Sequence, residues 1–132
     1  METKFSQHTK NWRLILNIPK TIFCDIDGVL FQHTGSLDQV FSEPIVISGT
    51  REKIQEWHLK GYIIILTTGR MPSLKSITEA QLIRAKIPYH DLIMGVSRGQ
   101  RVLINDYKSN SNEPTAIGIT LKRNKGIQNL DI

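Results

Sequence analysis

The stretch TIFCDIDGVLF, residues 21–31, decides the fold. A short apolar run leads directly to Asp25 and Asp27, and Gly28 follows. Carboxylates at the end of a buried strand are costly unless a partner binds them. Side chains i and i+2 of an extended segment share a face, so both aspartates point to one side while Ile26 points back into the core. This pattern predicts a strand that ends in a functional site.

The composition indicates one soluble globular domain over residues 1–132. The chain is 39% hydrophobic and 22% charged, and no apolar run approaches the roughly 18 residues that span a bilayer. Its one cysteine, Cys24, lies in the apolar run and indicates a small buried side chain. With no possible internal disulfide and no signal peptide pattern, we expect a cytoplasmic protein. Residues 1–19 give no clear structural signal.

Five short apolar runs predict strands, at residues 20–25, 62–66, 91–95, 101–105 and 115–119. Two segments between them predict helices. The first covers 50–60, with Thr50 as N-cap and an inner face of Ile54, Trp57 and His58. The second covers 73–86 and buries Leu74, Ile77, Leu82 and Ala85. Residues 29–48 are rich in glycine, serine and proline, which is typical of turns and a possible hairpin.

Strands that alternate with helices predict an α/β fold with a parallel sheet. The strands are almost continuously apolar, so we expect both faces of the sheet to be covered. Ligands of such sheets bind beyond the carboxyl ends of the strands. Three strands are followed there by polar residues, which we expect to converge: Asp25, Asp27 and Gly28; Thr67, Thr68, Gly69 and Arg70; Asn105 and Asp106.

Converging carboxylates suit a hard cation, and carboxylate oxygens together with a substrate phosphate suit Mg²⁺. A carboxylate also serves as a nucleophile that forms an aspartyl-phosphate. A strand-end hydroxyl such as that of Thr67 can donate to a phosphoryl oxygen, and Gly28 allows the backbone to approach an anion. These parts together favour phosphoryl transfer.

Three motifs resemble motifs I, II and IV of the haloacid dehalogenase superfamily of phosphatases: FCDIDGVLF at 23–31, IIILTTGR at 63–70 and VLINDYK at 102–108. The region from 57 to 126 is also similar to small members that are often found with sugar and capsule biosynthesis genes. The resemblance implies a Rossmann-like three-layer sandwich with a mostly parallel five-stranded sheet. It also implies a small β-hairpin flap within 29–48 and no cap domain.

The resemblance implies a role for each matching position. Asp25 is the expected nucleophile and a metal ligand, and Asp27 is the expected general acid/base, with its backbone carbonyl on the metal. Thr67 is expected to hydrogen-bond the transferring phosphoryl group. Asp106 is the expected further metal ligand, with Asn105 beside it. Substrate contacts are expected from four residues of the same motifs and the flap: Gly28, Thr68, Arg70 and His33.

The sequence departs from the family at motif III, where a lysine is expected. The corresponding stretch, MGVSRGQRVLIND at 94–106, contains no lysine. Arg98 is the nearest cation and Arg101 the next, and an arginine fork can clamp two phosphoryl oxygens. Arg98 is therefore a candidate catalytic residue, although an ordinary loop position explains it almost equally well.

The leading prediction is a Mg²⁺-dependent phosphatase that hydrolyses a small phosphorylated metabolite through an aspartyl-phosphate. The net charge of +5 leaves open a phosphatase for nucleic-acid ends or phosphoproteins. The aromatic content of 7% disfavours nucleic acid, because stacking platforms are few. A metal- and phosphate-binding regulatory module is a third possibility, since the lysine is missing. A capless site needs closure, so we expect a homo-oligomer, and nothing in the sequence indicates a membrane partner.

Overall fold

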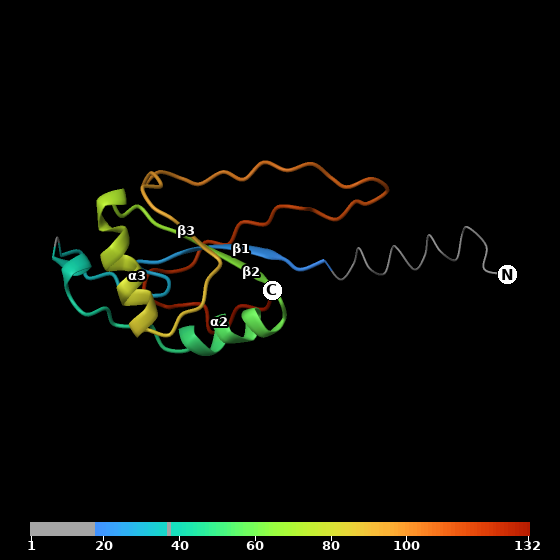
Figure 1. Ribbon diagram of the computed structural model, residues 1–132. Helices are drawn as coiled ribbons and strands as arrows, with labels where there is room; N and C mark the ends of the chain where they lie inside the picture. Colours follow the sequence, from blue (N-terminus) through green and yellow to red (C-terminus); the bar gives the residue numbers. More distant parts are fainter. Residues whose placement is uncertain (1–17, 37) are drawn as a thin grey trace.

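The computed structural model describes residues 18–36 and 38–132 of the chain. It is an α/β structure with three strands, β1 (Thr21–Asp25), β2 (Ile63–Thr67) and β3 (Asp91–Ile93). Two α-helices, α2 (Thr50–Leu59) and α3 (Lys75–Arg84), alternate with the strands (Figure 1). Short 3₁₀ turns, η1 (Gln39–Phe41) and η2 (Pro72–Leu74), precede α2 and α3. Residues 1–19 give no clear structural signal in the sequence, and positions 1–17 of this segment lie outside the described residues.

The three strands form an open parallel sheet in the order β1-β2-β3. Cys24 lies opposite Leu66, which lies opposite Leu92, and these side chains share one face of the sheet. One position further along, Asp25 lies opposite Thr67 on the other face. The parallel sheet predicted from the alternation of strands and helices is thus confirmed for its first three strands.

The core lies on the face of the sheet that carries Cys24, Leu66 and Leu92. Helix α2 adds Ile54 and Trp57 to this core, as the sequence predicts. The inner face predicted for the second helix is confirmed in part, because Leu82 and Ala85 join this core. The remaining fully or nearly buried apolar residues are Ile26, Leu30, Phe31, Ile64, Ile87 and Ile127.

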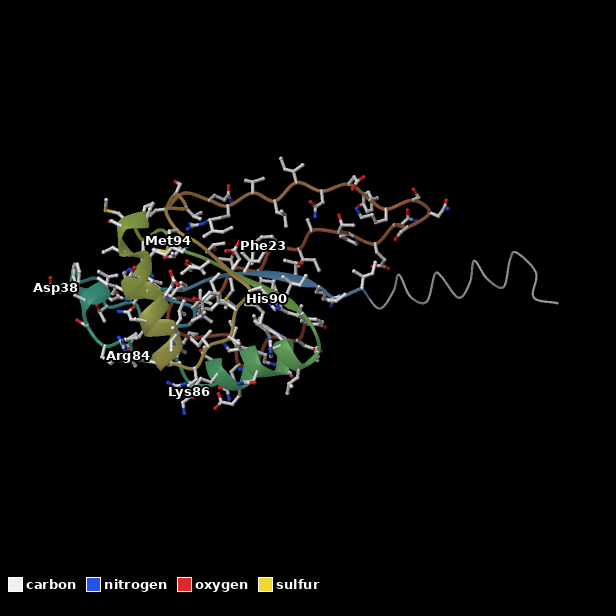
Figure 2. The ribbon with its side chains drawn as sticks, viewed as in Figure 1. Phe23, Asp38, Arg84, Lys86, His90 and Met94 are labelled. Carbon is white, nitrogen blue, oxygen red and sulfur yellow. The ribbon has the colours of Figure 1, made fainter. Side chains whose placement is uncertain are left out.

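The opposite face of the sheet is partly open, which corrects the expectation that both faces are covered. Phe23, labelled in Figure 2, is 52% exposed, and Ile63 and Ile93 are 39% and 42% exposed. Both helices contribute to the core on the Cys24 face, so the described residues form two layers rather than three. A run of β-branched residues predicts a strand but does not show whether a second layer covers it.

The predicted strands at 101–105 and 115–119 are not formed. This region runs as a long extended excursion, drawn from orange to red in Figure 1, with its apolar side chains in solvent. Val102, Ile104 and Ile117 are 75%, 86% and 75% exposed. The local pattern favours a strand, but a strand also needs a partner for its backbone groups. No described residue pairs with these backbones in a ladder.

Two smaller expectations also differ from the structure. Gly49, with φ of 81°, is the N-cap of α2, and Thr50 is its first residue. His58 is exposed rather than on the inner face, because the helix turns it away from the line that Ile54 and Trp57 define. The predicted flap is closed at its base by an isolated antiparallel bridge between Phe31 and Val46. No helix of the described part is long and apolar enough to cross a membrane.

Candidate active site

Asp25 and Thr67 end two adjacent parallel strands and face the same, open side of the sheet. Both are half-buried. Ile26, the residue between the two aspartates, is fully buried, as the alternation in the sequence predicts. The chain then turns at Gly28, because the amides of Leu30 and Phe31 both donate to the Ile26 carbonyl. The structure thus places the first two motifs at one edge of the sheet.

The pKa of Asp25 is raised above its ordinary value, chiefly because burial disfavours its charged form. The negative charge of Asp27 acts in the same direction. A hydrogen bond from the Ile26 backbone and the positive charges of Arg101 and His33 oppose the shift. Both cations therefore lie close enough to act on this carboxyl group. The neighbouring thiol of Cys24 has a pKa raised to about 12 by burial and by Asp25, so it stays protonated.

Asp27 is held by a bidentate ion pair with Arg70. The Nε and Nη2 atoms of Arg70 donate to the two oxygens of Asp27, each at 2.8 Å. The side chain of Arg70 is only 6% exposed and that of Asp27 is 22% exposed. Gln39 of η1 adds a third donor, with its Nε2 atom 3.1 Å from Asp27 Oδ1. The predicted acid/base residue is therefore fixed in place on both oxygens.

The remaining donors of Arg70 bind helix α3. Its Nη1 atom donates to Thr78 Oγ1 at 3.1 Å and to Gln81 Oε1 at 2.6 Å. In this structure the guanidinium therefore serves Asp27 and α3 rather than pointing out to a substrate. Thr68 is buried, and its hydroxyl accepts from the Arg70 amide at 3.1 Å. Thr78 and Gln81 were not among the predicted site residues, since nothing in their spacing distinguishes them from other helix positions.

Gly28 lies under the side chain of Arg123. Its φ of +89° is a conformation that other residues rarely adopt. A Cβ atom at this position would lie 3.3 Å from Arg123 Cγ and 3.7 Å from His33 Cβ. The sequence singles out Gly28 and His33 as candidates, but Arg123 is a functional candidate that only the structure reveals.

Asn124 fixes this part of the chain against the loop after β1. Its backbone amide donates to the Gly28 carbonyl at 2.8 Å. Its side chain accepts from the His33 amide at 2.7 Å and donates to the His33 carbonyl at 2.9 Å. Three hydrogen bonds thus hold residues 123–124 beside Gly28. No sequence pattern marks a contact between positions that are 91 residues apart.

The loop after β3 brings Arg98 to the other side of the site. The Val96 amide donates to the Thr68 carbonyl at 2.9 Å and fixes this loop beside motif II. A Cβ atom on Gly69 would lie 3.4 Å from Arg98 Cγ. Arg98 is exposed and forms no ion pair among the described residues. Arg98 thus lies over the turn that follows β2, whereas Arg101 is the arginine whose charge acts on Asp25.

Asn105 and Asp106 are not brought to the site. Asn105 Nδ2 donates to the Thr115 carbonyl at 3.1 Å. Asp106 Oδ1 lies 3.5 Å from Lys108 Nζ, and the side chain of Asp106 is 83% exposed. Among residues 18–36 and 38–132, no three His, Cys, Asp or Glu side chains are grouped closely enough to hold a metal ion. In this arrangement the residues present do not fit the expected Mg²⁺ site. The physical reason is the missing strand at 101–105, which would have to carry Asp106 to the sheet.

A hollow of about 450 Å³ lies at the start of α2, away from these residues. It is lined by Ser48, Gly49, Glu52, Lys53, Glu56 and Gln128. None of the candidate residues lines it, so it is not part of this site.

Neither protein-family models nor the curated proteins match the sequence. Several solved structures match this chain over part of its length. A chain of the Pnkp1/Rnl/Hen1 complex matches with 25% identity and a TM-score of 0.53, over 64% of this chain and 31% of that one. A protein from Vibrio cholerae matches with 21% identity and a TM-score of 0.51, over 66% and 79%. A D,D-heptose 1,7-bisphosphate phosphatase from B. bronchiseptica, complexed with magnesium and phosphate, matches with 18% identity, a TM-score of 0.47, and coverage of 57% and 49%.

The first two of these similarities, with TM-scores above 0.5, support the fold. The chain spans less than a third of the first structure that it matches. A chain of the Pnkp1/Rnl/Hen1 RNA repair complex also matches, with the same identity and TM-score, over 64% of this chain and 28% of that one.

Proposed function

We propose that the chain is a phosphatase that hydrolyses a small phosphomonoester through an aspartyl-phosphate on Asp25. The observation that carries the proposal is the placement of Asp25 beside Thr67 at adjacent strand ends, with the positive charges of Arg101 and His33 close enough to act on Asp25. A half-buried carboxylate near a guanidinium group suits an incoming phosphate dianion. The likeness of the fold to solved structures at low identity is consistent with this class.

In the proposed reaction an oxygen of Asp25 attacks phosphorus and the bond to the leaving oxygen breaks. Thr67 donates a hydrogen bond to the phosphoryl group, and Arg98 or Arg101 balances its charge in place of the missing lysine. Asp27 gives a proton to the leaving oxygen. It then takes one from a water molecule, which attacks phosphorus and releases phosphate and Asp25.

The ion pair of Asp27 places a condition on this scheme. Both carboxylate oxygens accept hydrogen bonds from Arg70, and one also accepts from Gln39. Three of the four lone pairs of the carboxylate are then occupied, so the proton that Asp27 gives and takes has to sit on the free lone pair of Oδ2.

We further propose that the sheet gains strands at 101–105 and 115–119 when the site is complete, and that Mg²⁺ binds there. The outer edge of β1 has no strand beside it in the described part of the chain. The apolar side chains of residues 102–104 are exposed, from 52% at Leu103 to 86% at Ile104. Addition of this segment to β1 as a parallel strand would place Asn105 and Asp106 at the carboxyl edge, near Asp25.

Closure of the open site by a second copy of the chain is also part of the proposal. The exposed apolar side chains of the sheet and of the 101–121 segment are candidates for such a contact. A chain that sediments as a monomer at micromolar concentration would contradict it. A cytoplasmic location fits the single buried cysteine.

A macromolecular substrate is the second candidate. The observation in its favour is the likeness to a chain of an RNA repair complex, together with the net charge of +5. Affinity for such a substrate would fall steeply with salt concentration.

The test is a screen of phosphorylated metabolites for phosphate release with Mg²⁺, with wild type and Asp25→Asn in parallel. We expect release by the wild type and a loss of at least about a thousandfold in the variant, because the nucleophile is gone. Asp38→Asn, which changes an exposed acid, is the matched control and should retain full activity. No release by the wild type from any metabolite would overturn the proposal and favour the non-catalytic module.

A further inference from the structure

Arg123 is an exposed cation on a fixed part of the chain, and its function is not explained by packing. Among residues 18–36 and 38–132 it forms no ion pair. Most exposed arginines lie on mobile side chains over ordinary surface. The backbone beneath this one is instead tied to Gly28 and His33 by the three hydrogen bonds of Asn124.

The position of Arg123 differs from that of the other two arginines near the site. Arg98 follows β3 and lies over Gly69, on the side of β2. Arg123 lies over Gly28, in the turn that follows β1. Asp25 ends β1 and lies opposite Thr67 at the end of β2, so both turns begin close to it. In the proposed reaction Arg98 or Arg101 balances the charge of the phosphoryl group at Asp25, which leaves Arg123 available for a different anionic group.

Two glycines make room for these cations. The stem of Arg123 lies at 3.3 Å and that of Arg98 at 3.4 Å from the places where Cβ atoms would stand on Gly28 and Gly69. Side chains at either position would push the arginine stems outward. Each turn thus leaves room for an arginine stem close to its backbone, and guanidinium groups bind anions strongly.

We propose that Arg123 is a specificity-determining residue, and that the substrate carries a second anionic group besides the phosphoryl group that Asp25 removes. This inference rests on the proposed function and narrows its substrate to small molecules with two anionic groups, such as bisphosphates or phosphorylated acids. Arg101 acts on Asp25, and Arg98 and Arg123 lie over the turns that follow β2 and β1, so these cations are grouped at one edge of the sheet rather than forming a track along the surface. A track is what a nucleic-acid backbone requires.

The test is calorimetric binding, in EDTA, of inorganic phosphate and of methylenediphosphonate, which carries two phosphoryl groups and no hydrolysable bridge. We expect the wild type to bind the diphosphonate at least about tenfold more tightly than phosphate, because a guanidinium contact to a charged group contributes on that scale. Arg123→Gln should abolish this preference and leave phosphate binding unchanged. Lys122→Gln removes the adjacent exposed charge and is the matched control, which should keep the preference.

Each result is decisive. Equal affinity for the two ligands in the wild type, or a preference that survives Arg123→Gln, overturns the inference while phosphate binding still supports the proposed function. No binding of either ligand, together with no phosphate release, overturns both. A 3′-phosphorylated oligonucleotide that binds more tightly than the diphosphonate, and weakens equally in the Arg123→Gln and Lys122→Gln variants, shows a diffuse nucleic-acid surface and also overturns the inference.

Discussion

Asp25 combines two properties that a nucleophile at a phosphate site needs. It is half-buried, so its carboxylate is poorly hydrated, and cationic side chains lie close enough to compensate when an anion binds. Burial is the largest cause of its raised pKa, and Asp27 adds to the shift. The ionised form that the reaction needs is thus held at a cost to stability.

This cost gives a pH-dependent prediction. Because the pKa is raised in the folded state, Asp25 lowers stability as pH rises from its ordinary value of 3.8 through the raised value. We expect Asp25→Asn to melt at a higher temperature than wild type at pH 7, and the difference to vanish near pH 3. The Asp38→Asn control should show no such trend. A variant that is less stable than wild type at pH 7 would contradict this account.

At the residue scale, the sequence identifies the parts of the site that lie on strand ends. Asp25, Asp27, Gly28 and Thr67 are adjacent to apolar runs, and the order of those runs is enough to bring them together. Arg123 was not predicted as a site residue. Its place beside Gly28 depends on Asn124 and its contacts with His33, which are tertiary hydrogen bonds without a local pattern.

At the element scale, Arg70 connects three elements. It follows β2, binds the turn after β1 through Asp27, and binds α3 through Thr78 and Gln81. Gln81 also donates to the carbonyls of Val40, which lies within η1, and of Ser42, which caps its C-terminal end. The relative positions of η1, α3 and the strand ends therefore depend on one buried polar network.

The network predicts a large effect of one substitution. We expect Arg70→Gln to lower the free energy of unfolding in urea by about 3 kcal/mol, because it leaves a partly buried carboxylate unpaired. Arg84→Gln is the matched control: its pair with Glu43 is 52% and 70% exposed and should contribute less than about 1 kcal/mol. Similar losses of unfolding free energy in both variants would show that the buried network contributes no more to stability than an exposed ion pair.

Strands and helices could be predicted where the local sequence carries a signal, but the pairing of a strand with a distant neighbour could not. The helical spacing of apolar residues in 50–60 corresponds to α2, and that in 73–86 corresponds to η2 together with α3. The runs at 101–105 and 115–119 carry the same kind of apolar signal as β1. Whether such a run becomes a strand depends on a distant edge, and the local sequence contains no information about that edge.

At the scale of the whole molecule, one face of the sheet packs against the core and the opposite face is partly open to solvent. The Cys24 face buries the core, whereas Phe23 and Ile93 on the opposite face are exposed. The extended segment 101–121 exposes several neighbouring apolar side chains to solvent. This is a larger apolar group than the surface of a monomeric protein usually exposes. In the described part of the chain, the outer edge of β1 and the apolar segment 101–121 both lack a strand partner, and each could serve as the other's partner.

We expect Mg²⁺ and phosphate together to slow hydrogen exchange at amides 102–105 by at least about tenfold, because strand addition pairs these groups with β1. Exchange followed by mass spectrometry of short peptides resolves this region. Amides 110–113, at the far end of the excursion, serve as the control and should be unchanged. Unchanged exchange at 102–105 with both ligands bound would contradict strand addition.

The most direct test of the central claim is to trap the phosphoryl group on the chain. During turnover of a substrate found in the screen, the reaction is quenched in acid and the peptides are mapped by mass. We predict one added phosphoryl group on the peptide that contains Asp25, and none on that peptide from Asp25→Asn. Continued phosphate release by Asp25→Asn, with no phosphoryl group on the chain, would contradict the account.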